Sequence, residues 1–174
     1  MSNDFYKKPS FIASGIIVLS CLFLSLFKVT FFRSTVSVSS FQTITKGASF
    51  SGDDSVSPER AAKKAEYFWK QAETAGFGII DNLSILMFVL AGALMFAAWK
   101  GNNGILNEQN IRIAKISLLV LSVFFVVRYG IGLGITGGGE AVSIGTGLWF
   151  TLLASIFIFF EDKIMAAVNA NMKK

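Results

Sequence analysis

Four long apolar runs constrain what this chain can fold into. The runs cover residues 11–32, 76–99, 116–135 and 141–160. A bilayer core about 30 Å thick is crossed by about 20 apolar residues in a helix. Each run meets or approaches that length, and the chain holds only two prolines that could interrupt a helix. The sequence therefore predicts an all-α membrane protein with four transmembrane helices.

The first run is the one that also resembles a targeting signal, because Lys7 and Lys8 precede it. It is longer than the core of a usual signal peptide, and no A-x-A-like cleavage site follows it. We therefore expect it to remain as a signal anchor. Basic residues in the two tails and in the loop between the second and third runs favour an orientation with both termini cytoplasmic, in a plasma membrane such as a bacterial inner membrane.

These expectations divide the whole chain into segments. The predicted segments are a cytoplasmic tail over 1–10, transmembrane helices over 11–32, 76–99, 116–135 and 141–160, an extracytoplasmic segment over 33–75, a cytoplasmic loop over 100–115, an outer turn over 136–140 and a cytoplasmic tail over 161–174.

The outer segment over 33–75 carries two local patterns. Alternation around Val36 and Val38 is typical of a short strand or β-hairpin, with an ordered loop as the alternative. Ser57 and Pro58 are typical of a helix start, so we expect an amphipathic helix over 58–75. Its predicted apolar stripe comprises Ala61, Ala65, Phe68, Ala72 and Ala75. This helix would either bind a partner or the membrane surface, or cover the protein's own helices.

Asp81 and Arg128 are charged residues set within the predicted spans. In the expected topology they lie about 7 Å and about 9 Å from the outer face, at a rise of about 1.5 Å per residue. An isolated charge in hydrocarbon is costly, so we expect an intramembrane ion pair. The pair is either a functional site or a static contact that fixes helix register.

Small residues crowd the third and fourth runs. Five recur at a spacing of four and predict a helix-packing ridge on the fourth span: Gly139, Ser143, Gly147, Thr151 and Ser155. Three more extend the spacing into the third span: Gly130, Gly134 and Gly138. Such a surface lets another helix approach closely, within one chain or between copies.

The composition argues against several kinds of site. The chain has no histidine and a single cysteine, Cys21, which excludes histidine-based triads, histidine-ligated zinc and disulfides within the chain. We therefore expect no enzyme activity and no catalytic, cofactor-binding or metal-binding residue. The net charge of +5 is spread around the apolar runs without a basic cluster, which favours lipid headgroups over nucleic acid as the partner.

Three functions fit these features. The first is a non-enzymatic integral membrane subunit that packs helices within a homo-oligomeric or multi-protein complex. The second is a pore or small transporter subunit that uses Asp81, Arg128 and the glycine-rich region of the third and fourth spans. The third is a membrane immunity or phage-defence protein, which the size alone suggests.

Overall fold

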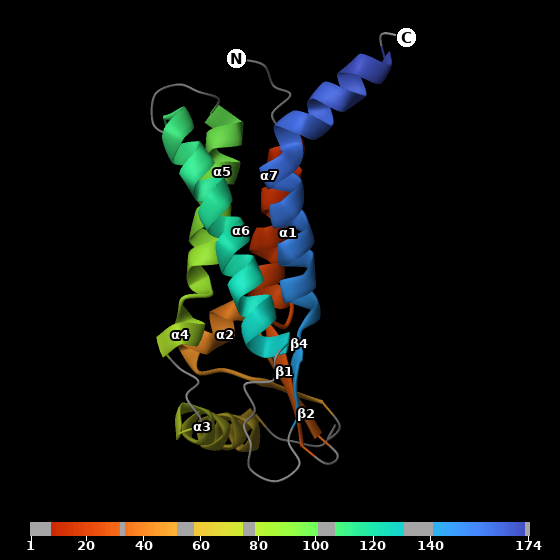
Figure 1. Cartoon of the computed structure of the whole chain (residues 1–174). Helices are drawn as coiled ribbons and strands as arrows, with labels where there is room; N and C mark the ends of the chain where they lie inside the picture. Colours follow the sequence, from red (N-terminus) through yellow and green to blue (C-terminus); the bar gives the residue numbers. More distant parts are fainter. Residues whose placement is uncertain are drawn as a thin grey trace.

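The computed structural model describes residues 8–31, 34–51, 58–74, 79–100, 107–130 and 141–172. These residues form a mostly helical structure with one small sheet (Figure 1). In chain order the elements are α1 (Pro9–Phe23), β1 (Phe27–Phe31), β2 (Ser34–Val38), α2 (Ser40–Thr45), β3 (Ser49–Ser51), α3 (Pro58–Thr74), α4 (Ile79–Asn82), α5 (Ile85–Lys100), α6 (Glu108–Gly130), β4 (Ala141–Ile144) and α7 (Thr146–Met172).

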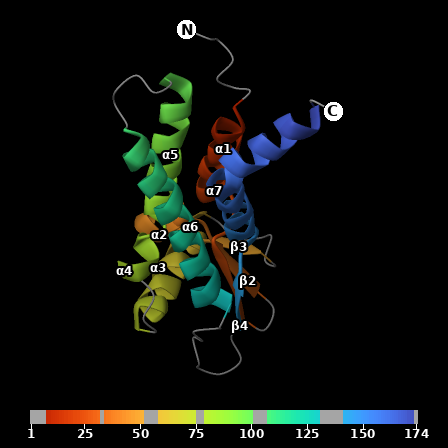
Figure 2. The same cartoon turned by 45° about the horizontal axis from the view of Figure 1, so that its top comes forward.

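Four helices, α1, α5, α6 and α7, pack side by side and are called here the helix group. Both α1 and α6 pack against α5 and against α7. The two views place α1 and α7 on one side and α5 and α6 on the other (Figures 1 and 2). At one end, the terminal end, α1 begins, α5 ends and α6 begins. The sheet, α2, α3 and α4 lie at the opposite end, the sheet end (Figure 1).

Among the described residues, two helical stretches are long and apolar enough to cross a membrane. They are Ile80–Lys100, which joins α4 to α5, and Glu108–Gly130, which is α6. They correspond to the predicted spans over 76–99 and 116–135. The helix α6 begins earlier than expected, and residues 131–140 lie outside the described parts of the chain.

The two other predicted spans differ from the expectation because each contributes a strand. The run over 11–32 forms a helix only to Phe23, and β1 follows from Phe27. The run over 141–160 begins as β4, and its helix, α7, starts at Thr146 and continues to Met172. Hydropathy alone does not distinguish a short apolar strand from part of a helix, so both strands were hidden inside the runs.

The sheet has the order β3-β2-β1-β4, and each neighbouring pair is antiparallel. Val29 of β1 lies opposite Val36 of β2 on one side and Val142 of β4 on the other. Phe27, Val29 and Val36 are buried, and their alternation turns one face of the sheet toward the core. The fold is therefore not all-α. The pairing of β1 with the edge strand β4 joins opposite ends of the sequence.

The predictions for the outer segment fit the structure more closely. The expected strand around Val36 is β2, and it pairs with β1 and β3. The expected helix over 58–75 is α3, which buries Ala65, Phe68 and Ala72. Trp69 is also buried, and its indole Nε1 donates to the Gly47 carbonyl at 3.0 Å. These contacts favour the interpretation that α3 covers the protein's own core. The side chain of Ala61, and Ala75, lie outside the described parts.

Two chain junctions cross closely where the helix group meets the sheet. The Gly145 amide, between β4 and α7, donates to the Leu26 carbonyl at 2.9 Å, and the Gly147 amide donates to the Ser25 carbonyl at 2.9 Å. A Cβ atom at Gly145 would lie 2.1 Å from the Ser25 carbonyl oxygen. Only glycine leaves room for this backbone contact. The crossing joins the segment after α1 to the segment before α7.

We predict that Gly145→Ala destabilises the protein because the new methyl group would collide with backbone rather than with a side chain that can move. Overpacking of this kind costs about 3 kcal/mol at the upper end of its usual range. Thermal unfolding in mild detergent would measure the loss. Gly15→Ala is the matched control, because a Cβ atom there meets nothing within 4 Å. Equal melting temperatures for the two variants would contradict the importance of the crossing.

Candidate functional site

The predicted pair of Asp81 and Arg128 forms a buried cluster with Tyr129. Arg128 Nε donates to Asp81 Oδ1 at 3.0 Å, and Arg128 Nη2 donates to Oδ2 at 3.1 Å. The Tyr129 hydroxyl donates to Oδ1 at 2.6 Å. The Asp81 side chain is fully buried, and that of Arg128 is 11% exposed. The carboxylate thus receives a two-point contact from the guanidinium and a third hydrogen bond from the phenol.

Two elements position this cluster, the short helix α4 and the end of the long helix α6. Asp81 lies in α4, a helix of four residues, and the Ser84 amide donates to its carbonyl at 3.0 Å. Arg128 and Tyr129 occupy the last turn of α6, near the sheet end. The Tyr129 ring stacks on Phe27 of β1, with ring centroids 4.9 Å apart. The cluster therefore lies where the helix group, α4 and the sheet meet.

The geometry suits a fixed structural contact. A guanidinium and a carboxylate that meet in parallel form one of the strongest charged hydrogen-bonded pairs, and burial makes the loss of either partner costly. The carboxylate accepts three hydrogen bonds at once, which holds α4 against the end of α6. Of the two interpretations from the sequence, this arrangement favours the static contact that fixes helix register.

The predicted packing ridge is present only in part. Gly147, Thr151 and Ser155 lie on α7, and all three are buried. Ser143 belongs to β4, where it lies opposite Lys28 and is exposed. A spacing of four follows one face of a helix but has no such meaning in a strand, so Ser143 does not continue the ridge. Gly139 lies outside the described residues.

The buried part of the ridge contacts the other helices of the group. A Cβ atom at Gly147 would lie 2.8 Å from Leu24 Cβ, so the glycine allows α7 to approach the end of α1. The hydroxyl oxygens of Ser155 and Ser122 of α6 lie 3.0 Å apart. The small residues therefore pack helices of the same chain together.

Of the three predicted glycines of the third span, the structure describes only Gly130. Gly130 ends α6, and a Cβ atom there would make an ordinary contact with Ile144 Cδ1 at 3.4 Å. Gly134 and Gly138 lie outside the described residues. Within the described parts of the chain, no group of three or more Cys, Asp or Glu side chains is placed to hold a metal ion.

Sequence reasoning missed two polar contacts. Tyr129 was overlooked although it follows Arg128 directly in the sequence. A second ion pair joins Lys115 of α6 to Glu161 of α7 at 3.2 Å, at the terminal end, with side chains 16% and 12% exposed. Glu161 also accepts a hydrogen bond from the Ser10 amide of α1 at 3.0 Å. The available signal was that Lys115 directly precedes the third predicted span and Glu161 directly follows the fourth.

We predict that Asp81→Ala and Arg128→Ala each lower stability by about 3–5 kcal/mol, because each leaves a buried charge without its partner. The double variant should lose less than the sum of the two. Tyr129→Phe should cost about 1–3 kcal/mol, because it removes a buried donor. Unfolding in detergent measures all four, with Tyr67→Phe, an exposed tyrosine of α3, as the control. Strictly additive losses would contradict the coupling.

Comparisons with family models, with curated proteins and with solved structures gave no match. The chemistry and the placement of the described residues are therefore the basis for a functional proposal.

Proposed function

We propose that this chain is a non-enzymatic integral membrane protein that serves as a helix-packing subunit of a homo-oligomeric or multi-protein membrane complex. In this proposal the four helices of the helix group lie in the bilayer with both termini cytoplasmic. The sheet and α3 lie on the outer side. The observation that carries the proposal is the distribution of polar and apolar side chains over the helix group.

Large apolar side chains cover the outside of the helix group. Phe23 is 76% exposed, Leu153 61% and Val120 60%, and they belong to three different helices. Other exposed apolar residues continue this surface on all four helices: Ile12, Leu19, Val89, Trp99, Ile113, Val123, Val127, Trp149 and Phe150. A soluble monomer rarely exposes apolar patches of this extent, whereas lipid tails accommodate them. The exterior therefore supports burial in a bilayer.

The interior of the helix group holds hydroxyl groups. Ser122 and Ser155 are buried, and their side chains donate to the carbonyls of Leu118 and Thr151 at 2.8 Å and 2.6 Å. The Thr151 hydroxyl donates to the Gly147 carbonyl at 2.8 Å. Small residues that satisfy their own hydroxyls allow close packing where lipid surrounds the helices. Hydroxyls buried inside the helix group and large apolar side chains on its outside support the membrane location.

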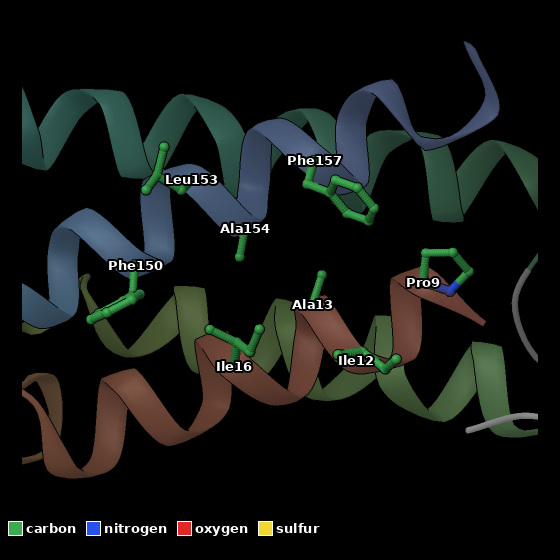
Figure 3. Close-up of a pocket in the computed structure, with 8 residues that line it drawn as sticks. All are labelled: Pro9, Ile12, Ala13, Ile16, Phe150, Leu153, Ala154 and Phe157. Carbon is green, nitrogen blue, oxygen red and sulfur yellow. The ribbon is translucent and has the colours of Figure 1, made fainter. Parts of the chain in front are cut away.

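A groove between α1 and α7 supports the role as a subunit. It has a volume of about 390 Å³, and Ala13 and Ala154 face each other across it (Figure 3). Ile12 and Ile16 line it from α1, while Phe150, Leu153 and Phe157 line it from α7. Small residues between large apolar ones form the kind of surface that a further helix can approach within a membrane.

The alternative pore hypothesis draws less support from the described residues. Met87, Leu118, Phe125 and Ile158 are fully buried, so the centre of the helix group is packed with apolar side chains. Asp81 and Arg128 neutralise each other. A pore would have to form between several copies of the chain.

We expect the protein to resist extraction from membranes by alkaline carbonate and to expose its two ends on opposite sides. On a Cys21→Ser background, Glu66→Cys in α3 should react with a membrane-impermeant maleimide in intact cells. Gln109→Cys at the start of α6 should react only in opened membranes. Both original residues are exposed. Release of the protein from the membranes by carbonate would contradict the membrane location. The reverse labelling pattern would contradict the orientation.

We also expect cross-linking through the groove in native membranes. Ile12→Cys and Leu153→Cys, tested singly with a short bifunctional reagent, should give a product of higher mass. Val120→Cys, exposed on α6, serves as the control.

A product of twice the mass would identify a second copy, and another stoichiometric mass would identify a different subunit. A symmetric oligomer with a central opening would favour the pore. Absence of any groove-specific product would contradict the proposed packing surface.

A further inference from the structure

The face of the sheet that points away from the core carries a row of polar side chains. Lys28 of β1 lies opposite Ser37 of β2 and opposite Ser143 of β4, so the three residues, called here the Lys28 row, cross three neighbouring strands. Phe27 and Val29, on either side of Lys28 in the sequence, are buried in the hydrophobic core. Because successive side chains of a strand point to opposite faces, the Lys28 row lies on the outward face.

Hydroxyl groups surround the ammonium of Lys28 on this face. Ser49 of β3 continues the row beyond Ser37, and Thr30 and Thr35 form a second row beside it. Lys28 is the only charged residue of the four strands, which contain no Asp or Glu. The outward face therefore combines one positive charge with several hydroxyls and offers no carboxylate.

The polar groups of the Lys28 row are available to a ligand. The Ser49 hydroxyl already accepts a hydrogen bond from Gln42 Nε2 at 3.1 Å. Within the described ranges, by contrast, no side-chain hydrogen bond or ion pair involves Lys28, Ser37 or Ser143. Lys28 and Ser37 are half-buried and Ser143 is exposed. An ammonium between two hydroxyls, each without a partner, provides donors for an anion.

The Lys28 row lies next to the helix group. Strand β1 follows α1 and strand β4 precedes α7 at the sheet end (Figure 1). Phe23, which is 76% exposed, comes five positions before Lys28, and Trp149, which is 47% exposed, comes six positions after Ser143. The outer apolar surface of α1 and α7 thus ends just before the row begins. In the proposed membrane location, the row lies where the hydrocarbon gives way to lipid headgroups.

We propose that the Lys28 row binds the phosphate of an anionic phospholipid whose headgroup carries no positive charge, of the phosphatidylglycerol type, in the leaflet at the sheet end. The Lys28 ammonium contacts the phosphate, the hydroxyls of Ser37 and Ser143 donate to its oxygens, and the acyl chains enter the hydrocarbon beside the end of α1. The proposal rests on the membrane location proposed above.

The charge of the face favours this headgroup over two common alternatives. A lysine ammonium has three N–H donors, and its hydrogen bonds to phosphate oxygens are strengthened by charge. A choline or ethanolamine headgroup adds a second positive charge, which Lys28 repels and for which the strands offer no carboxylate. A glycerol headgroup adds only hydroxyls, which the hydroxyls of Thr30 and Thr35 can match. An unpaired charge on the wrong ligand therefore provides the discrimination.

The test is the binding of short-chain lipids to the purified full chain in mild detergent, followed through the melting temperature. The midpoint is the lipid concentration that gives half of the maximal rise. Dioctanoyl phosphatidylglycerol should have a midpoint roughly tenfold lower than the phosphatidylcholine and phosphatidylethanolamine analogues, the change expected for one charged hydrogen bond. Lys28→Gln should remove this preference, and Lys28→Arg should retain it. The double variant Ser37→Ala, Ser143→Ala should raise the phosphatidylglycerol midpoint.

Lys100→Gln is the matched control, because Lys100 is an exposed cation at the terminal end, far from the sheet. It should leave the lipid preference unchanged. Equal midpoints for the three lipids, or a preference that survives Lys28→Gln, would overturn the proposal. Glycerophosphoglycerol, the same headgroup without acyl chains, should have no effect at the lipid's midpoint concentration. An equal effect would assign the row to a soluble anion and overturn the lipid.

Carbonate resistance of the protein in native membranes separates this proposal from the one on which it rests. If the protein resists carbonate while the lipid preference is absent, only the lipid site fails. If carbonate releases the protein, the membrane location and the lipid site fail together.

Discussion

Two backbones touch without an intervening side chain where α1 passes into β1 and β4 passes into α7, and the rest of the structure depends on this contact. The amides of Gly145 and Gly147 donate across it, and a Cβ atom at Gly145 would overlap the Ser25 carbonyl. The crossing holds β4 beside β1, which fixes Phe27 under the ring of Tyr129. Tyr129 in turn donates to Asp81. The buried charge cluster is therefore positioned by a contact between glycines and backbone.

The helix group buries hydroxyl groups beside large apolar side chains. The hydroxyls of Ser122, Thr151 and Ser155 donate to carbonyls one turn earlier in their own helices, so these buried donors are satisfied. Small side chains let the helices approach closely, large apolar side chains such as Met87 and Phe125 fill the centre, and others cover the exterior. In water this arrangement exposes much apolar surface, a cost that the proposed bilayer location would remove.

The sequence predicted helices and local patterns better than it predicted their limits. The helix over 58–75 could be predicted because Ser57 and Pro58 are typical of a helix start and the apolar residues after them recur at helical spacing. The pairing of Asp81 with Arg128 could be predicted because these two isolated charges lie at similar distances from the outer ends of consecutive predicted spans. The strand β1 was hidden, because Phe27 and Val29 continue an apolar run whose length alone suggested one helix. The pairing of β1 with β4 joins residues more than a hundred positions apart, and no local pattern encodes it. The short helix α2 was not predicted, although Ser39 and Gln42, which form a reciprocal capping box, were an available signal.

The short joints between helix and strand also have a mechanical consequence. A single residue, Gly145, separates β4 from α7, and three residues separate α1 from β1. Hydrogen bonds tie these two joints to each other, so neither can hinge independently. A change in the tilt of α7 against α1 must therefore shear β4 along β1, and a load applied to the sheet must pull on both helices. The positions of the two helices are therefore coupled to the pairing of β4 with β1.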